Sequence, residues 1–456
     1  MSTPSEHKRS RPDQPPLFDL AGDPPPPATT TAGPARGKPR LRTPNRQQIV
    51  SRAAPLDALI PEDHPARIVW SYVEGLDLAP LYDRIRSVER APGRAPIDPK
   101  ILMALWLFAT VEGVSSARRL DELCREHAAF QWIAGDVSTS YHTLADFRTD
   151  HVELLDDLLT TSVATLLAEG LVDLNRVAQD GMRVRASAGA ASFRRRPTLD
   201  EALAQAQAQV EALQAEAEEE PASADRRRKS AQQRAARERA ERIKAALERL
   251  PELEAKKEAD SKDQARCSTT DPEATVMKRG DGGFRPAYNV QFATDTGSQV
   301  IVGVDVITSG SDAGQMAPMV EQVEARSGVV PPGWLVDGGF AQHDQIEAVG
   351  EREPGCTVYA PVPKPKDPKV DRHAPKPSDG AAVGAWRQRM ATEEAKAIYK
   401  ERASTAECVN ALTRRRGLVL LPVRGAVKVK AIALWQARAH NLLRGAQLRA
   451  LGSGAA

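Results

Sequence analysis

The stretch from Leu174 to Ser187 constrains the fold of this chain most, because it has the pattern of a β-strand with a carboxylate at its centre. Side chains alternate in character from Val177 to Val184 around Asp180, and a period of two residues is typical of a strand. Asp is depleted in strands because its carboxylate is costly to bury. Two interpretations follow from the residues alone: an edge-strand acid paired with Arg183 or Arg185, or a ligand of a hard divalent cation.

Two later segments favour the metal interpretation. The apolar run at Gly333–Val336 ends in Asp337-Gly-Gly, which predicts a strand whose carboxyl end carries an acid, where ligand sites of α/β sheets gather. Residues 398–414 are predicted to be helical and place Tyr399, Arg402 and Glu407 within about two turns. One acid on each of three regular elements is the arrangement expected of a carboxylate cage for two metal ions.

These segments resemble the DDE transposases of bacterial insertion sequences. Within the broad set of transposases similar to those of insertion sequences four and five, the resemblance is to the group numbered eleven-eighty-two. The similar segments are Val177-Ala-Gln-Asp180-Gly-Met-Arg-Val-Arg-Ala, Asp271-Pro-Glu-Ala, Gly283-Phe-Arg-Pro-Ala-Tyr-Asn-Val-Gln291, Trp334-Leu-Val-Asp337-Gly-Gly-Phe, Tyr399-x-x-Arg402 with Glu407, and Ala439-His-Asn-Leu442. The resemblance covers roughly residues 50 to 445. The chain departs from the signature at Arg414, where a Lys is usual, and at Cys408-Val-Asn-Ala411, where an apolar-Phe-Gly stretch is commoner.

The resemblance implies a ribonuclease-H-like mixed α/β sheet in which Asp180, Asp337 and Glu407 are the catalytic, metal-binding residues. It implies two Mg²⁺ ions, replaceable by Mn²⁺, and contacts from Tyr399, Arg402 and Arg414 to phosphates near the scissile bond. The implied partner is double-stranded DNA, as transposon ends and as target, bound by a homodimer. The expected reaction is hydrolysis at each end followed by attack of the 3′-hydroxyl on target DNA.

The charge distribution, the cysteines and the lack of long apolar runs limit which functions and which cellular location the sequence allows. Lys and Arg number 63 against 61 Asp and Glu, so net charge says nothing about nucleic acid. Residues 411–456 nevertheless carry nine basic and no acidic residues, and residues 182–197 are basic only. Such runs near candidate catalytic acids are interpreted as a track for DNA phosphates. Four scattered Cys and no long apolar run predict a cytoplasmic, nucleoid-associated protein without a zinc site, signal peptide or membrane span.

Changes in composition along the chain predict four regions: a tail, a helical domain, a catalytic core and an insertion within that core. Residues 1–48, rich in Pro and Arg, are predicted to be disordered. Residues 49–168 are predicted to form a helical DNA-binding domain, with Asp98-Pro99 starting one helix. A helix-turn-helix and an ordinary bundle are both consistent with the residues, and the resemblance favours DNA binding with exposed His142 and Arg148. Residues 169–198 and 266–450 form the predicted catalytic core, interrupted at 199–265 by a coiled-coil-like helical hairpin.

Alternatives stay open at this point. Other acids near predicted strand ends compete for the ligand roles: Asp271, Asp295, Asp305 and Asp312. For Asp271 and Asp312 the plain interpretation is helix capping or turn formation. An inactive DNA-binding relic, a stand-alone nuclease of the same fold and a coiled-coil scaffold are the competing functions. The scaffold does not explain strands that carry Asp180 and Asp337.

Overall fold

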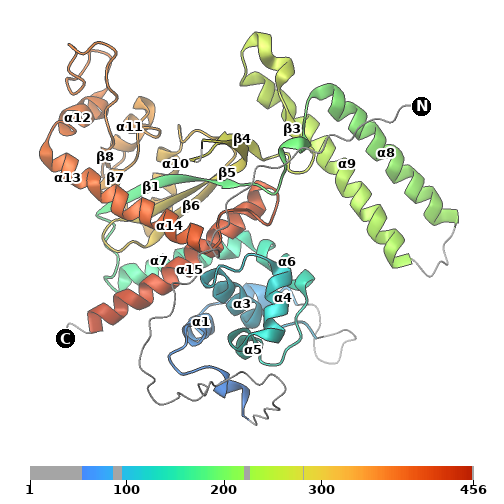
Figure 1. Ribbon diagram of the computed structural model, residues 1–456. Helices are drawn as coiled ribbons and strands as arrows, with labels where there is room; N and C mark the ends of the chain where they lie inside the picture. Colours follow the sequence, from blue (N-terminus) through green and yellow to red (C-terminus); the bar gives the residue numbers. More distant parts are fainter. Residues whose placement is uncertain (1–53, 86–94, 220–225, 281, 454–456) are drawn as a thin grey trace, which may run out of the picture. The chain divides into compact units, whose positions relative to one another are not determined.

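A mixed β-sheet, to which the predicted catalytic strands belong, lies at the centre of the protein (Figure 1). The computed structural model describes residues 54–85, 95–219, 226–280 and 282–453. The predicted tail at 1–48 lies outside them. The strands are β1 (Arg176–Arg185), β2 (Phe193–Arg194), β3 (Cys267–Ser268), β4 (Thr275–Lys278), β5 (Phe284–Asp295), β6 (Ile301–Ile307), β7 (Gly333–Leu335) and β8 (Thr357–Tyr359).

The sheet combines antiparallel and parallel pairing. Its order is β4-β5-β1-β7-β8, with β6 beside β5, while β2 and β3 form a separate pair. Strand β1 is antiparallel to β5, β5 is antiparallel to β6, and β1, β7 and β8 run parallel. The predicted Asp180 strand and the predicted hairpin of β5 and β6 are therefore confirmed. Strand β1 is central because one edge pairs with the hairpin and the other with the parallel strands.

Helices precede the sheet. They are α1 (Pro65–Glu74), α2 (Ala79–Tyr82), α3 (Pro99–Val111), α4 (Ala117–Glu126), α5 (Ala128–Ala134), α6 (Tyr141–Thr149) and α7 (Val152–Ala168), after a 3₁₀ turn at Leu56–Leu59. The predicted start of α3 is confirmed, since the Asp98 carboxylate accepts a hydrogen bond from the Lys100 N–H at 2.8 Å. Almost the whole length of α3 is buried, as expected of the central helix in a helical layer.

One hydrophobic core joins these helices to the sheet. Residues 54–456 group as a single compact unit, and the buried apolar cluster runs from Val69 on α1 through Val290 on β5 to Leu434 on the last helix, α15 (Ala426–Ser453). Helix α15 contacts α3, α6, α7 and β6. No helix of the described residues is both long enough and apolar enough to cross a membrane.

The remaining core helices follow the hairpin of strands. They are α10 (Met316–Ser327), α11 (His343–Gly350), α12 (Ala381–Arg389), α13 (Glu393–Arg402) and α14 (Cys408–Arg415), with one π-helical turn at Ala403–Glu407 between α13 and α14. The expectation that Asp312 caps α10 is wrong, because α10 begins only at Met316. The Asp312 carboxylate instead accepts hydrogen bonds from the side chains of Asn289 and Gln291.

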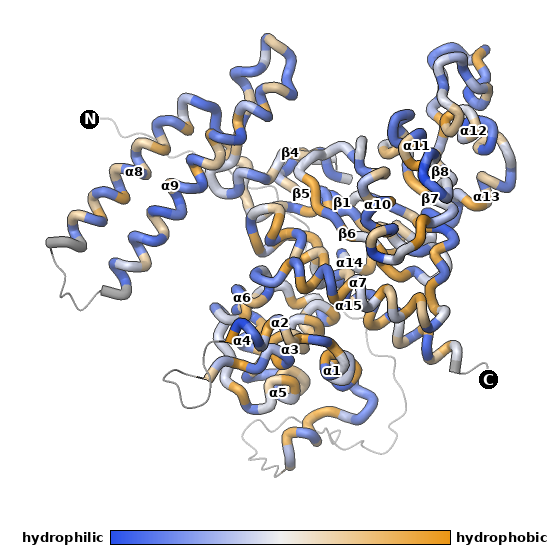
Figure 2. The backbone as a smooth tube through the Cα atoms, turned by 180° about the vertical axis from the view of Figure 1, so that it is seen from behind, coloured by the Kyte–Doolittle hydropathy of each residue, from blue (hydrophilic) through white to orange (hydrophobic). Residues whose placement is uncertain are grey.

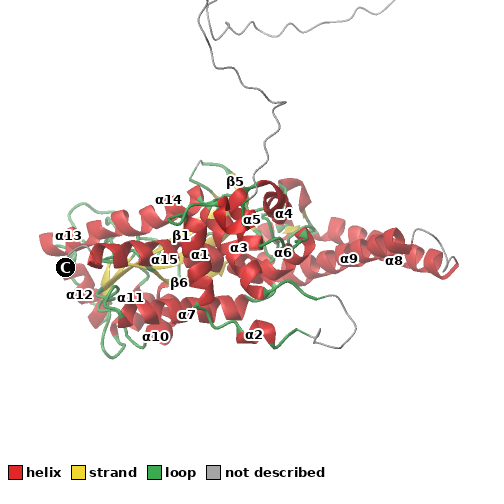
Figure 3. Cartoon of the chain, turned by 90° about the horizontal axis from the view of Figure 1, so that it is seen from below, coloured by secondary structure: helices red, strands yellow, loops and turns green. Residues whose placement is uncertain are grey.

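Two long helices fill the predicted insertion. Helices α8 (Arg196–Glu219) and α9 (Arg226–Ala255) lie side by side (Figure 3) and share a small apolar cluster that includes Leu199, Ile243 and Leu250. A 3₁₀ segment, Ala259–Gln264, leads back to β3. Figure 2 shows α9 as mostly hydrophilic along its length. Because so little of the hairpin is buried, its packing against the core depends on contacts at its base, such as that of Arg249 with the Pro272 carbonyl.

Side-chain amides from α10 and α15 cap the unpaired edge of β6, which these helices bury. Asn441 on α15 accepts from the Ile301 N–H and donates to the Ile301 carbonyl, both at 2.8 Å. Gln322 on α10 binds the Val304 N–H at 2.8 Å and the Val304 carbonyl at 3.1 Å in the same way. Each amide satisfies the backbone groups that a further strand would pair with, which prevents edge-to-edge association.

A buried histidine beside this edge makes stability depend on pH. His440 is 3 % exposed, and its Nε2 donates to the Gln299 carbonyl at 2.8 Å while Arg416 lies at its Nδ1. Burial lowers the pKa of His440 from 6.5 to about 4. Between these two pH values the unfolded chain binds a proton that the folded chain does not, so stability falls as the pH falls.

We therefore expect acidification from pH 7 to pH 5 to lower the free energy of unfolding by about 2 kcal/mol through His440 alone. Denaturant titrations of wild type and His440→Gln at both pH values measure this, and the variant should lose most of that pH dependence. His142→Gln is the matched control, since His142 is exposed. An unchanged pH dependence in His440→Gln would contradict the assignment.

Candidate functional site

Asp180 lies in the middle of β1 with both carboxylate oxygens engaged. Oδ1 accepts from the Gly181 N–H at 3.0 Å and lies 3.1 Å from the Arg402 guanidinium. Oδ2 accepts from the Asn410 side-chain amide at 3.0 Å. Burial raises the pKa of Asp180, while the charge of Arg402 opposes that rise. The interpretation of Asp180 as an edge-strand acid paired with Arg183 or Arg185 is wrong, because β1 is central and the partner is Arg402.

Asp337 comes from the neighbouring parallel strand. Ala178 on β1 pairs with Leu335, the last residue of β7. Both acids lie two residues further along their chains, so the register carries Asp337 level with Asp180. Asp337 Oδ1 accepts from the Gly339 N–H at 2.8 Å, which fixes the turn after the strand. Its side chain is 42 % exposed, so this second acid faces solvent more than Asp180 does.

Glu407 reaches the same place because of the π-helical turn. In a regular α-helix, residues five apart point in different directions, whereas the wider π turn, with its i→i+5 hydrogen bonds, brings them closer to one side. The turn at Ala403–Glu407 therefore brings Glu407 round to the side of Arg402, and the Glu407 carboxylate lies 3.6 Å from the Arg402 guanidinium. π turns often occur at functional sites. The sequence pattern predicted a helix here without this turn.

Arg402 lies among all three acids. Its guanidinium is 3.1 Å from Asp180, 3.6 Å from Glu407 and 4.0 Å from Asp337, and its side chain is only 12 % exposed. A bidentate pair of Arg176 on β1 with Glu401 on α13, at 2.8 and 3.0 Å, anchors the end of α13. The guanidinium thus neutralises one of three converging negative charges.

The donor chemistry of this cluster fits a hard divalent cation, because all three acids offer oxygen. The carboxylates are too far apart to share one metal ion as they stand. Within the described ranges, no three acidic, His or Cys side chains lie close enough together to hold a metal ion. The Arg402 guanidinium lies within 4.0 Å of all three carboxylates. A cation bound by Asp180, Asp337 and Glu407 would therefore compete with Arg402 for the same oxygens.

The other predicted DNA contacts differ in exposure. Tyr399 is half-buried on α13, and burial raises its pKa. Arg414 at the end of α14 is exposed. His142 is exposed and stacks on Tyr141 with ring centroids 4.0 Å apart. These positions leave Arg414 and His142 free to meet a large ligand.

The prediction of an exposed Arg148 is wrong. Its side chain is buried, its guanidinium lies 4.6 Å from the centre of the Trp106 ring, and it donates to the Ser115 carbonyl. Trp435 on α15 donates to the Arg148 carbonyl at 3.0 Å. Arg148 therefore joins α6 to α3 and α15. The sequence could not show this because these partners lie far away in the chain.

The competing acids have other partners. Asp271 is buried and accepts from the Tyr288 hydroxyl at 2.6 Å and from the Gly425 N–H, where α15 begins. Asp295 accepts from Ser298 in the turn between β5 and β6. Asp305 is half-buried on β6. Asp312 belongs to the polar network with Asn289 and Gln291.

Asn410 is the site residue that the sequence reasoning missed. It lies one turn after Glu407 on α14, is 5 % exposed, and binds Asp180 directly. The sequence does place Asn410 three residues after Glu407, and residues three apart share a helix face, so this spacing could have indicated that Asn410 lies near the acids.

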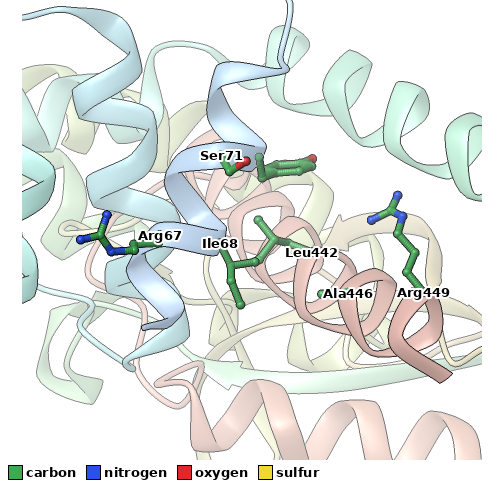
Figure 4. Close-up of a pocket in the computed structure, with 7 residues that line it drawn as sticks. Arg67, Ile68, Ser71, Leu442, Ala446 and Arg449 are labelled. Carbon is green, nitrogen blue, oxygen red and sulfur yellow. The ribbon is translucent and has the colours of Figure 1, made fainter. Parts of the chain in front are cut away.

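A pocket of about 450 Å³ between α1 and α15 is a separate feature (Figure 4). Ile68 and Leu442 line it together with Ser71, Tyr72 and Ala446, while Arg67 and Arg449 stand at its sides. None of its lining residues is acidic, so it does not resemble a cation site.

Comparison with known families connects this geometry to a protein class. Residues 54–150 match a family described as Transposase domain (DUF772), and residues 258–419 match one described as Transposase DDE domain. The second match includes Asp337 and Glu407, while Asp180 precedes it. No curated protein and no solved structure gives a significant match. The chain thus carries two transposase domains, which support a DDE transposase of an insertion sequence.

Proposed function

We propose that this protein is a transposase of group eleven-eighty-two that binds the ends of its insertion sequence, cleaves them and joins the 3′ ends to target DNA. The observation that carries the proposal is the convergence of Asp180, Asp337 and Glu407, from three separate elements, on one guanidinium. A ribonuclease-H-like fold is part of the proposal. It is supported by the three antiparallel strands β6, β5 and β1 followed by the parallel strands β7 and β8.

In this proposal Asp180, Asp337 and Glu407 hold two Mg²⁺ ions, for which Mn²⁺ substitutes. Bound cations of this kind activate the attacking oxygen and stabilise the leaving one. The chain's own contribution is to orient three carboxylates by fixing them on two parallel strands and a helix. In the proposal, Arg402 contacts a phosphate near the scissile bond once it is displaced from the acids, and Tyr399, which lies one turn before it, does the same.

Exposed basic residues support DNA binding beside the acids. Arg414 and Arg415 end α14, Arg185 ends the Asp180 strand, and Arg194 and Arg195 come after it. The C-terminal basic run contributes less than its composition suggests. Arg438 is buried, Arg444 donates to the Ser298 carbonyl, and Arg449 pairs with Glu169. The phosphate track is therefore proposed for the first set, with His142 on α6 as a further contact.

The test is a cleavage and joining assay with linear DNA that carries the inverted repeats flanking the coding region, a plasmid target and Mg²⁺. We expect nicking at the repeat ends and joined products. Cleavage without joining would favour the stand-alone nuclease, and end binding without cleavage would favour the inactive relic. Binding should also weaken steeply as salt rises, because released counterions drive phosphate contacts.

Arg414 offers a specific test of the phosphate track. Seven residues separate Glu407 from Arg414, about two helical turns, so they share a face, whereas Arg415 is rotated by roughly 100°. Both side chains are exposed. We expect Arg414→Ala to reduce cleavage about tenfold, Arg415→Ala to change it little, and Arg414→Lys to keep most activity, because a point charge suffices for a single phosphate contact. Equal effects of the two Ala variants in parallel cleavage assays would contradict this.

A further inference from the structure

Asn410 binds the central acid of the proposed site through one half of its amide. The side-chain NH₂ donates to Asp180 Oδ2 at 3.0 Å, and Asn410 is 5 % exposed. The other half, Oδ1, is buried and has no hydrogen-bond partner among the described residues. Among the described residues, the Asn410 amide thus makes one side-chain hydrogen bond, and its partner is Asp180.

This arrangement gives the fold no evident advantage. A buried oxygen without a partner destabilises the folded state, whereas an apolar side chain of similar shape avoids that loss. Of its buried neighbours on α14, Val409 is apolar, and Thr413 is polar but satisfies its hydroxyl on the Asn410 backbone carbonyl. The hydrogen bond to Asp180 and the unpaired Oδ1 therefore have opposite effects on stability, and Asn410 gives the fold little net gain.

The contact does restrict Asp180. The Gly181 N–H and Arg402 engage Oδ1, and Asn410 engages Oδ2 from the opposite end of the carboxylate. Contacts to both oxygens oppose rotation of the carboxylate about its Cβ–Cγ bond. A cation bound by the acids would displace Arg402 from Oδ1, whereas Asn410, two turns further along the same continuous helix, contacts only Oδ2.

We propose that Asn410 is a positioning residue that holds the Asp180 carboxylate in the orientation needed to bind a divalent cation. The proposal rests on the proposed function, because it assigns Asp180 to the metal site. It also gives a role to the segment Cys408–Ala411, where the chain departs from the signature that it otherwise resembles. Partners of metal ligands commonly matter in this way, with losses of roughly 10- to 100-fold on their removal.

The experiment measures Mn²⁺ binding to the full chain without DNA, from the electron paramagnetic resonance signal of free Mn²⁺, together with thermal stability. In Asn410→Leu we expect Mn²⁺ binding to weaken about tenfold or more, while Tm changes little, because loss of the hydrogen bond to Asp180 is offset by removal of the unpaired Oδ1. Asn410→Ala, which adds no bulk, should weaken binding equally and serves if the Leu variant does not fold. Asn441→Leu is the matched control for a buried structural amide: its Tm should fall while the folded protein keeps its Mn²⁺ affinity.

Asp180→Asn distinguishes failure of the metal site from failure of the positioning role of Asn410. If wild type binds Mn²⁺, Asp180→Asn loses it and both Asn410 variants bind as wild type does, the positioning role is overturned and the carboxylate site stands. A lowered Tm with unchanged affinity in the Asn410 variants likewise overturns it in favour of a structural role. If wild type binds no Mn²⁺, or Asp180→Asn binds it normally, the metal site itself fails and the positioning role fails with it.

Discussion

Asp180→Asn and Asp337→Asn will each abolish DNA cleavage in Mg²⁺, by about 10³-fold or more, while binding of the DNA ends survives. Loss of a ligand removes cation stabilisation of several kcal/mol, and each 1.4 kcal/mol or so is a factor of ten in rate. Asn keeps the shape of Asp, so the sheet should stay folded. Binding survives because the exposed residues proposed to contact DNA, such as Arg414 and His142, are unchanged.

The measurement is a gel assay of end cleavage beside a filter or mobility-shift assay of end binding. Asp305→Asn is the matched control, because Asp305 is a half-buried strand acid outside the cluster around Arg402. Glu407→Gln should behave as the two Asp variants do, despite its greater exposure of 64 %. Retained cleavage in Asp180→Asn or Asp337→Asn would refute the carboxylate assignment.

Gly181→Ala is expected to destabilise the fold by about 3 kcal/mol or more, at the upper end for overpacking. A Cβ at this position would lie 2.3 Å from Asp312 Oδ1, 2.4 Å from Gln291 Nε2 and 2.6 Å from Asn289 Oδ1. These three side chains are buried, and those of Asn289 and Gln291 both donate to Asp312 Oδ1. The extra methyl group must therefore break a buried polar network as well as displace atoms.

Thermal unfolding measures this, with an expected fall in Tm of roughly 6 °C or more, at about 2 °C per kcal/mol for a large domain. Gly189→Ala is the control, because nothing lies within 4 Å of a Cβ there and its φ of −88° suits Ala. A Tm close to that of wild type in Gly181→Ala would show that the network rearranges easily. The position matters for function because Gly181 directly follows Asp180 on β1.

Local rules in the sequence were enough to place several parts correctly. Alternation predicted the strand that carries Asp180, which is β1. The Asp98-Pro99 pair predicted the start of α3. Local patterns also predicted that Asp337 follows a short strand and that Glu407 lies on a helix. Such features depend on residues a few positions apart, so the pattern contains the information that they need.

Only the tertiary structure decided which side chains meet. Arg402 and Asp180 lie far apart in the chain, as do Asn410 and Asp180, and no local rule relates them. The burial of Arg148 depends on Trp106 and Ser115 in the same way. The π turn at Ala403–Glu407, which brings Glu407 beside Arg402, is likewise not something that a regular helical period predicts. Sequence determined the elements and their acids because propensity and spacing are local, whereas charge pairing and burial depend on contacts between distant segments.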